Sequence, residues 1–117
     1  MTEKSYPDIV GHLTKTLRTM HRDLPGPMKG FGSLADSAKA NGTLDTKTKE
    51  LIACAISIAL RCDGCIGFHT RGAIRAGASR QEFLEMIGVA LMMGGGPSSV
   101  YGAYAIDAYD QFAATTA

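Results

Sequence analysis

A ten-residue apolar run, Leu51–Leu60, ends one residue before a pair of closely spaced cysteines and sets the limits on how this chain can fold. Asp45 stands two polar turns upstream and is suited to cap a helix that begins there. The run is apolar on nearly every side, so we expect a central helix that is buried all round. It is far shorter than the roughly 20 residues needed to cross a membrane, which favours a globular core and no membrane partner.

Helical periodicity continues on the N-terminal side of this run. Apolar residues recur at helical spacing after Pro7, which predicts a first helix that runs to about Arg22 and ends before Pro25 and Pro27. A second helix is predicted over 28–41, before Gly42. These residues share one stripe of the second helix: Phe31, Leu34 and Ala38.

Three more helices are predicted after the central one. Arg61 and the cysteine stretch interrupt the pattern, and the fourth helix follows through Ile74 to Ala76 and stops at Gly77. Ser79 and Glu82 form a capping box that opens the fifth, and Pro97 suits the start of the sixth. The fifth has an expected core stripe of Phe83, Ile87, Ala90 and Leu91, thickened by Met86, Met92 and Met93; in the sixth, Tyr101, Tyr104, Ala105 and Ala108 share a face. Residues 113–117 are expected to be a frayed tail.

No segment shows sustained strand alternation, so the predicted fold class is all-α, an array of about six helices. With 117 residues the chain is one domain, in which N-terminal helices (1–42) precede a core (43–117). The net charge of +1 and the scattered Lys and Arg give no reason to expect nucleic acid as a partner. Residues 1–10 lack the apolar core of a secretory signal, and we expect a cytoplasmic protein.

The chemistry is concentrated in Cys62, Cys65 and His69. If the segment from Cys65 onward is helical, His69 lies one turn further on the same face and its ring can reach the Cys65 sulfur. A neighbouring imidazole or the positive end of a helix favours the nucleophilic thiolate. Cys62 is placed to close a disulfide once Cys65 is oxidised. The pattern therefore indicates thiol redox chemistry.

Zinc binding is the alternative, because Cys62, Cys65 and His69 supply three ligands and Cys54 a fourth. Structural zinc sites usually take two chelating pairs from separate segments, and the second pair is missing here. No metal and no cofactor is therefore expected. Cys54 is expected to be a buried small hydrophobe, and the isolated histidines, His12 and His21, to be surface or packing residues.

Glu50 stands where the polar part of the central helix becomes apolar. Periodicity alone predicts a solvated carboxylate at the helix margin. Twelve residues of unbroken helix would place it about 18 Å from Cys62. Glu50 can act on the thiols only if the cysteine helix folds back against the central helix, or if another subunit supplies the contact.

The spacing of Glu50, Cys62, Cys65 and His69 resembles the active-site signature of the AhpD-like alkylhydroperoxidases, in the carboxymuconolactone decarboxylase superfamily. The similarity covers roughly 43–96, including the Ala-Ile-x-Ala-Gly-Ala run at 73–78 and the Ser-capped helix that follows. Decarboxylase members of the superfamily act on a lactone acid and lack the cysteine pair, so the pair argues against that activity.

The resemblance implies an all-helical subunit that assembles into trimers or hexamers and reduces a hydroperoxide without metal or flavin. It implies that Cys65 is the peroxidatic thiol, Cys62 the resolving thiol and His69 the proton acceptor, while Glu50 orients or polarises His69. An external dithiol reductant would restore the pair.

One position departs from the family pattern. The best-known members carry a second histidine immediately before the second cysteine, where this chain has Gly64. The change removes a possible proton donor for the leaving alcohol, which favours a general dithiol-disulfide oxidoreductase or redox sensor as the alternative. Tyr101 and Tyr104 either line the access path to the thiols or form a subunit seam.

Overall fold

The computed structural model describes residues 3–116, and these form six helices and no strand. The helices are α1 (Tyr6–Asp23), α2 (Pro25–Lys39), α3 (Thr46–Leu60), α4 (Asp63–Arg75), α5 (Arg80–Gly94) and α6 (Gly96–Thr116). The all-α prediction is confirmed. None of the helices in the described range is long and apolar enough to cross a membrane.

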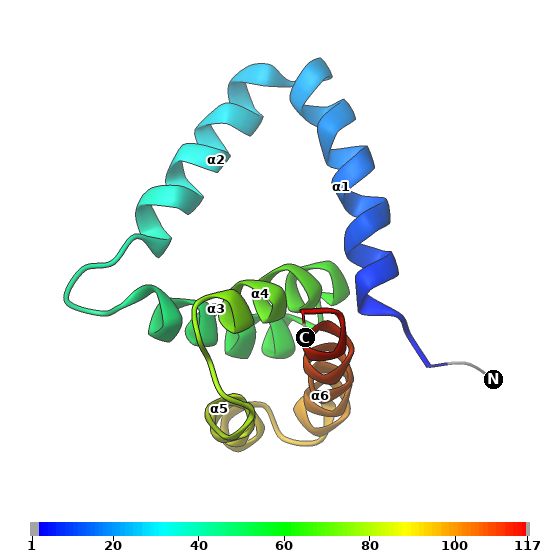
Figure 1. Cartoon of the computed structure of the whole chain (residues 1–117), viewed down its shortest axis with the longest axis vertical. Coiled ribbons are helices and arrows are strands. Elements are labelled where there is room, and N and C mark those ends of the chain that lie inside the picture. The colour runs from blue at the N-terminus through cyan, green and yellow to red at the C-terminus, as the bar shows by residue number, and fades with distance from the viewer. Residues whose placement is uncertain (1–2, 117) are drawn as a thin grey trace.

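The helices α3 to α6 form a bundle, and α1 and α2 extend away from it (Figure 1). The first turns of α1 lie against the bundle, where they pack on α4 and α6. The buried core draws on every helix except α2: Tyr6, Val10, Cys54, Ile58, Ile66, Ala73, Ala78, Phe83, Met86, Ala90, Ala105, Ala108, Tyr109 and Phe112.

Local signals placed most helix ends correctly. Asp45 caps α3 by accepting a hydrogen bond from the Thr48 N–H, and the Ser79–Glu82 capping box opens α5. Gly77 follows α4 with φ +96°, a left-handed backbone that favours glycine. The start of α2 was wrong by three residues, because Pro25 and Pro27 lie in its first turn, where a missing N–H costs nothing. The predicted tail is helical through residue 116, while residue 117 lies outside the described range.

Burial differs from the prediction on α3 and α5. The central helix α3 is not buried all round, since Ile52, Ile56 and Leu60 are exposed. On α5, Phe83, Met86 and Ala90 are buried, but Leu91, Met92 and Met93 face outward and do not fill the core. Both helices are covered on one side only, and α2, which could cover α3, stands apart from the bundle (Figure 1).

Gly67 allows α1 to approach α4 at the cysteine end. A Cβ at residue 67 would lie 2.6 Å from Val10 Cγ2 and 3.7 Å from Tyr6 Cδ1. Since Val10 and Tyr6 are themselves core residues, they have little room to move.

We predict that Gly67→Ala destabilises the protein by about 1–3 kcal/mol, because the added methyl overpacks the α1–α4 contact. Thermal and urea unfolding followed by circular dichroism measure this. The matched control is Gly88→Ala on α5, where an added Cβ meets nothing within 4 Å; it should be neutral or stabilising by up to about 1 kcal/mol. Equal stability of the two variants would contradict the tight contact.

Candidate functional site

The two cysteines of the motif lie in the turn that opens α4. Arg61 ends α3 in the left-handed conformation (φ 56°), which turns the chain sharply. Cys62 is the N-cap of α4, and its Sγ accepts a hydrogen bond from the Cys65 N–H at 3.2 Å. The two residues are joined by a disulfide, with their Cα atoms 5.2 Å apart. The predicted Cys62–Cys65 pairing is therefore geometrically available to this chain.

The position of both sulfurs at the start of α4 has an electrostatic consequence. The N–H groups of a first helical turn carry partial positive charge, which stabilises a thiolate formed when the disulfide is reduced. His69 follows Cys65 by one turn on the same helix, a rise of about 6 Å. Cys65 and His69 therefore have the helical register that was predicted for them.

Glu50 and His69 meet between α3 and α4. The helix α4 packs back along α3, so the separation expected for one continuous helix does not arise. The residue Glu50 is only 5% exposed, and its Oε1 accepts a hydrogen bond from His69 Nδ1 at 2.8 Å. The expectation of a solvated Glu50 is therefore wrong, because α4 covers the carboxylate. When Nδ1 donates to Glu50, the neutral ring has its lone pair on Nε2, where it can accept a proton.

Gly72 provides the space for the Glu50 carboxylate. A Cβ at residue 72 would lie 2.7 Å from Glu50 Cδ and would overlap Oε2. The absence of a side chain at residue 72 therefore lets the Glu50 carboxylate pack against α4.

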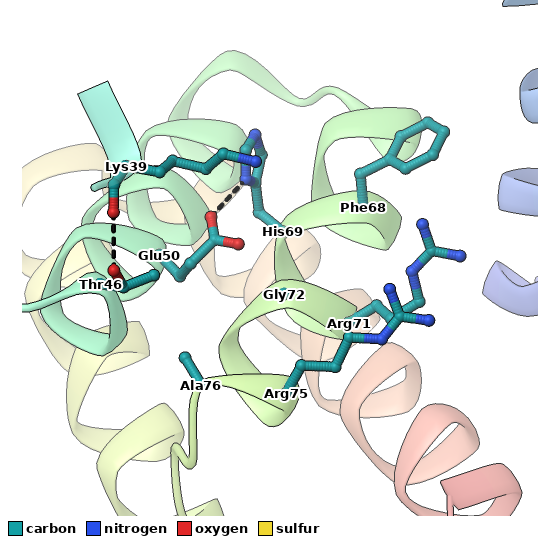
Figure 2. A pocket seen from close by; sticks show the side chains of 9 residues that line it. All are labelled: Lys39, Thr46, Glu50, Phe68, His69, Arg71, Gly72, Arg75 and Ala76. Carbon is teal, nitrogen blue, oxygen red and sulfur yellow. Dashed lines mark hydrogen bonds and ion pairs between the residues drawn. The ribbon is translucent and has the colours of Figure 1, made fainter. Parts of the chain in front are cut away.

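A pocket of about 410 Å³ opens beside the Glu50–His69 pair, and we call it the His69 pocket. Its walls come from the end of α2, the start of α3 and one side of α4 (Figure 2). It is lined by Lys39, Thr46, Glu50, Phe68, His69, Arg71, Gly72, Arg75 and Ala76. Neither Cys62 nor Cys65 lines it, so it leads to the acid–base pair and not directly to the disulfide.

Asp63, which lies between the two cysteines, is held by the N-terminal segment. Its Oδ2 forms an ion pair with Lys4 Nζ at 2.9 Å, and its Oδ1 accepts a hydrogen bond from the Tyr6 hydroxyl at 2.8 Å. The Asp63 interaction raises the pKa of Lys4, and burial, then Asp63, raises the pKa of Tyr6. The Lys4 ammonium also lies over the rings of Tyr104 (3.9 Å) and Tyr101 (5.2 Å).

This arrangement affects the electrostatics at the thiols. An unpaired carboxylate beside the sulfurs would oppose thiolate formation, and the Lys4 charge offsets it. Sequence reasoning missed Lys4, Tyr6 and Asp63 because their interaction spans more than 50 residues. The one available signal was an acidic residue inside the motif.

Cys54 is separate from this site chemistry. It is buried in α3, and burial first, with the nearby charge of Glu50, raises its pKa to about 12, while contact with the Thr70 hydroxyl acts in the opposite direction. Cys54 therefore stays protonated at neutral pH, in agreement with its expected role as a small hydrophobe. His12 and His21 are exposed on α1, far along the chain from the motif. In the range 3–116 no three His, Cys, Asp or Glu side chains are grouped as a metal site.

Comparison with known proteins gives a consistent family relationship. The model of the carboxymuconolactone decarboxylase family matches residues 25–108. An uncharacterized protein of Cupriavidus necator is 36% identical over 86 residues, which cover 74% of this chain and 76% of that protein.

Two solved structures have the same fold. A carboxymuconolactone decarboxylase family protein of Legionella pneumophila, crystallised in its apo form, is 45% identical with a TM-score of 0.90, covering 92% of this chain and 96% of that one. A family protein of Thermotoga maritima, for which a part in the antioxidative response has been suggested, is 28% identical with a TM-score of 0.82, covering 92% of each chain.

We predict that Cys54 is unreactive in the native protein. A rise in pKa from 9.0 to about 12 lowers the thiolate fraction at pH 8 by orders of magnitude. In the double variant Cys62→Ser, Cys65→Ser, the remaining thiol should react with a chromogenic disulfide at least about a hundredfold more slowly than the reduced wild-type protein. Denaturation in guanidinium is the control and should restore rapid reaction. Rapid labelling of the folded double variant would contradict the burial of Cys54.

Proposed function

Because the chain belongs to the carboxymuconolactone decarboxylase family, and because Glu50 on α3 is bonded to His69 on the cysteine helix α4, we propose that it is a thiol-dependent peroxidase acting on organic hydroperoxides. The observation that carries the proposal is the 2.8 Å hydrogen bond from His69 Nδ1 to the buried Glu50 carboxylate. It fixes a proton acceptor one helical turn from Cys65. The antioxidative role suggested for the Thermotoga relative supports the same chemistry.

The proposed reaction begins with the reduced pair. His69 Nε2 accepts the Cys65 proton, and the thiolate attacks the terminal oxygen of the hydroperoxide. The O–O bond breaks, the alcohol leaves with a proton, and Cys65 becomes a sulfenic acid. The Cys62 thiol then condenses with the sulfenic acid, which releases water and forms the disulfide. An external dithiol reduces this disulfide and is itself oxidised, a step suited to the reducing cytoplasm.

Glu50 acts in this scheme as a positioning residue. It holds Nδ1 as the donor, so the basic lone pair is on Nε2. It also stabilises the imidazolium that forms when His69 accepts the proton. Gly72 supports this positioning because it leaves open the space that the Glu50 carboxylate occupies.

A dithiol-disulfide oxidoreductase is the second candidate, and the surroundings of Gly64 favour it. A Cβ at residue 64 would lie 2.7 Å from Leu13 Cδ1, so α1 occupies the space that a larger side chain would need. The site therefore lacks a proton donor for the leaving alcohol at this position. Disulfide exchange between thiols has no such requirement.

The exposed apolar faces support assembly into a homo-oligomer. No residue of α2 is buried, and its Phe31 and Leu34 are 66% and 62% exposed. On α3, Ile56 and Leu60 are 54% and 71% exposed. A helix without tertiary burial is marginally stable in water, so α2 needs a partner surface. We propose that copies of this chain cover these faces, in the trimer or hexamer that the family resemblance implies.

We predict that the reduced protein consumes cumene hydroperoxide in the presence of an added dithiol. Stopped-flow spectroscopy should show that Cys65→Ser abolishes consumption, because no sulfur is left to attack. Cys62→Ser should give a single oxidation, with the sulfenic acid trapped by dimedone and no further turnover. Consumption that persists in Cys65→Ser would refute the assignment. Rapid reduction of small disulfides with negligible peroxide consumption would select the oxidoreductase instead.

We predict that Gly72→Ala slows peroxide reduction about tenfold or more, because the new methyl displaces the Glu50 carboxylate. Glu50→Gln, which removes the charge without adding bulk, should have an effect in the same direction. The pH profile of Cys65 alkylation distinguishes positioning from a loss of fold: it should move to higher pH in both variants, since the base is less well supported. An unchanged profile in both would remove Glu50 from the scheme.

We predict that light scattering after size-exclusion chromatography gives a mass of three or six chains. Ile56→Asp should lower this mass, because a charge on the exposed face of α3 cannot be buried without cost. Thr19→Asp adds the same charge at an exposed polar position of α1 and serves as control. A monomeric wild-type protein at micromolar concentration would rule out the assembly.

A further inference from the structure

Cationic side chains gather where α4 faces α1 and α2, although the net charge of the chain is only +1. Arg71 and Arg75 line both the His69 pocket and a neighbouring pocket of about 570 Å³ along α1. Lys39 lines the first pocket, and Lys15 and Arg18 line the second. The expectation of scattered charge is therefore wrong for this part of the surface.

These cations lack carboxylate partners. Among residues 3–116, the ion pairs of Lys and Arg join Lys4, Arg22, Lys47 and Arg80 to acidic residues, and none involves the five cations of the two pockets. Glu50 is the one carboxylate among the described lining residues of either pocket, and it is bonded to His69. An anion entering the His69 pocket would thus meet unneutralised guanidinium groups.

Arg71 and Arg75 lie on consecutive turns of α4 and point to the same side (Figure 2). Burial lowers the pKa of Arg71, and repulsion from the nearby charge of Arg75 lowers it further. The Arg71 guanidinium also lies 5.5 Å from the centre of the Phe68 ring. A bound carboxylate would relieve this repulsion and accept two charge-assisted hydrogen bonds.

The spacing along α4 connects this anion site to the reactive sulfur. Arg71 and Arg75 follow Cys65 by about 9 and 15 Å along the helix axis. Phe68 and His69 lie between the arginines and Cys65 in the sequence, and both line the pocket. An extended molecule held at its charged end by the arginines can run along this side of α4 past Phe68.

We propose that the His69 pocket selects elongated hydroperoxides that carry a carboxylate, such as those of fatty acids, and that Arg71 and Arg75 bind the carboxylate. This inference rests on the peroxidase function proposed above. The chemistry is unchanged: the Cys65 thiolate takes the terminal oxygen, the O–O bond breaks, and the alcohol leaves with its carboxylate intact. Arg71 and Arg75 are specificity residues, while Phe68 contacts the hydrocarbon chain.

The test compares the hydroperoxide of linoleic acid with its methyl ester, which differs only in the charge. The wild-type protein should show a kcat/KM for the acid about tenfold or more above that for the ester. This ratio should fall toward one in Arg71→Gln and Arg75→Gln and should decrease with added salt. For each variant, dividing the kcat/KM for the acid by the kcat/KM for the ester corrects for any general loss of activity. Arg22→Gln, an exposed arginine at the far end of α1, should keep the wild-type ratio.

A binding measurement separates this inference from the peroxidase proposal. Dodecanoate below its micelle concentration cannot react, and calorimetry should show that it binds wild-type protein about tenfold or more tightly than either pocket arginine variant. Such binding without peroxide consumption would leave the anion site standing and overturn the peroxidase. Equal rates for acid and ester, or dodecanoate binding that is absent or independent of both arginines, would overturn the anion site.

Discussion

The hydrogen bond between Glu50 and His69 ties the cysteine helix to the central helix, and the candidate site depends on it. Glu50 is buried only because α4 packs back along α3, and Gly72 leaves the room that its carboxylate needs. A buried carboxylate without a hydrogen-bond donor would destabilise the fold. His69 satisfies the carboxylate, and the same contact directs the basic nitrogen of the ring away from Glu50.

The N-terminal segment completes the site from the other side. Lys4 and Tyr6 engage both oxygens of Asp63, so the acidic residue between the thiols is neutralised by groups far away in the sequence. Along the same contact, α1 fills the space beside Gly64 and Gly67. The two glycines are therefore required by the proximity of α1, and the absence of a histidine at residue 64 has a structural reason.

Most of the sequence predictions that failed were those that depend on distant packing. The apolar run of α3 predicted complete burial, yet Ile52, Ile56 and Leu60 are exposed, since the helix α2 that could cover them stands apart. The prediction that Met92 and Met93 fill the core was also wrong, because both side chains are exposed on α5. The cationic pockets could not be predicted from composition, because a net charge of +1 does not show where Arg71, Arg75 and Lys39 lie in the fold.

The sequence by itself determined the six helices, the caps formed by Asp45 and Ser79, the end of α4 at Gly77, and the pairing of Cys62 with Cys65. These features arise from hydrogen bonds and backbone preferences within a few residues, so they can be recognised locally. The contact of Glu50 with His69 was implied by the family resemblance but not by the helical pattern, and only the tertiary structure decided that Lys4 meets Asp63 and which helix faces remain uncovered. Those outcomes depend on the angle at which helices pack, and that angle is set by the whole core and not by any one segment.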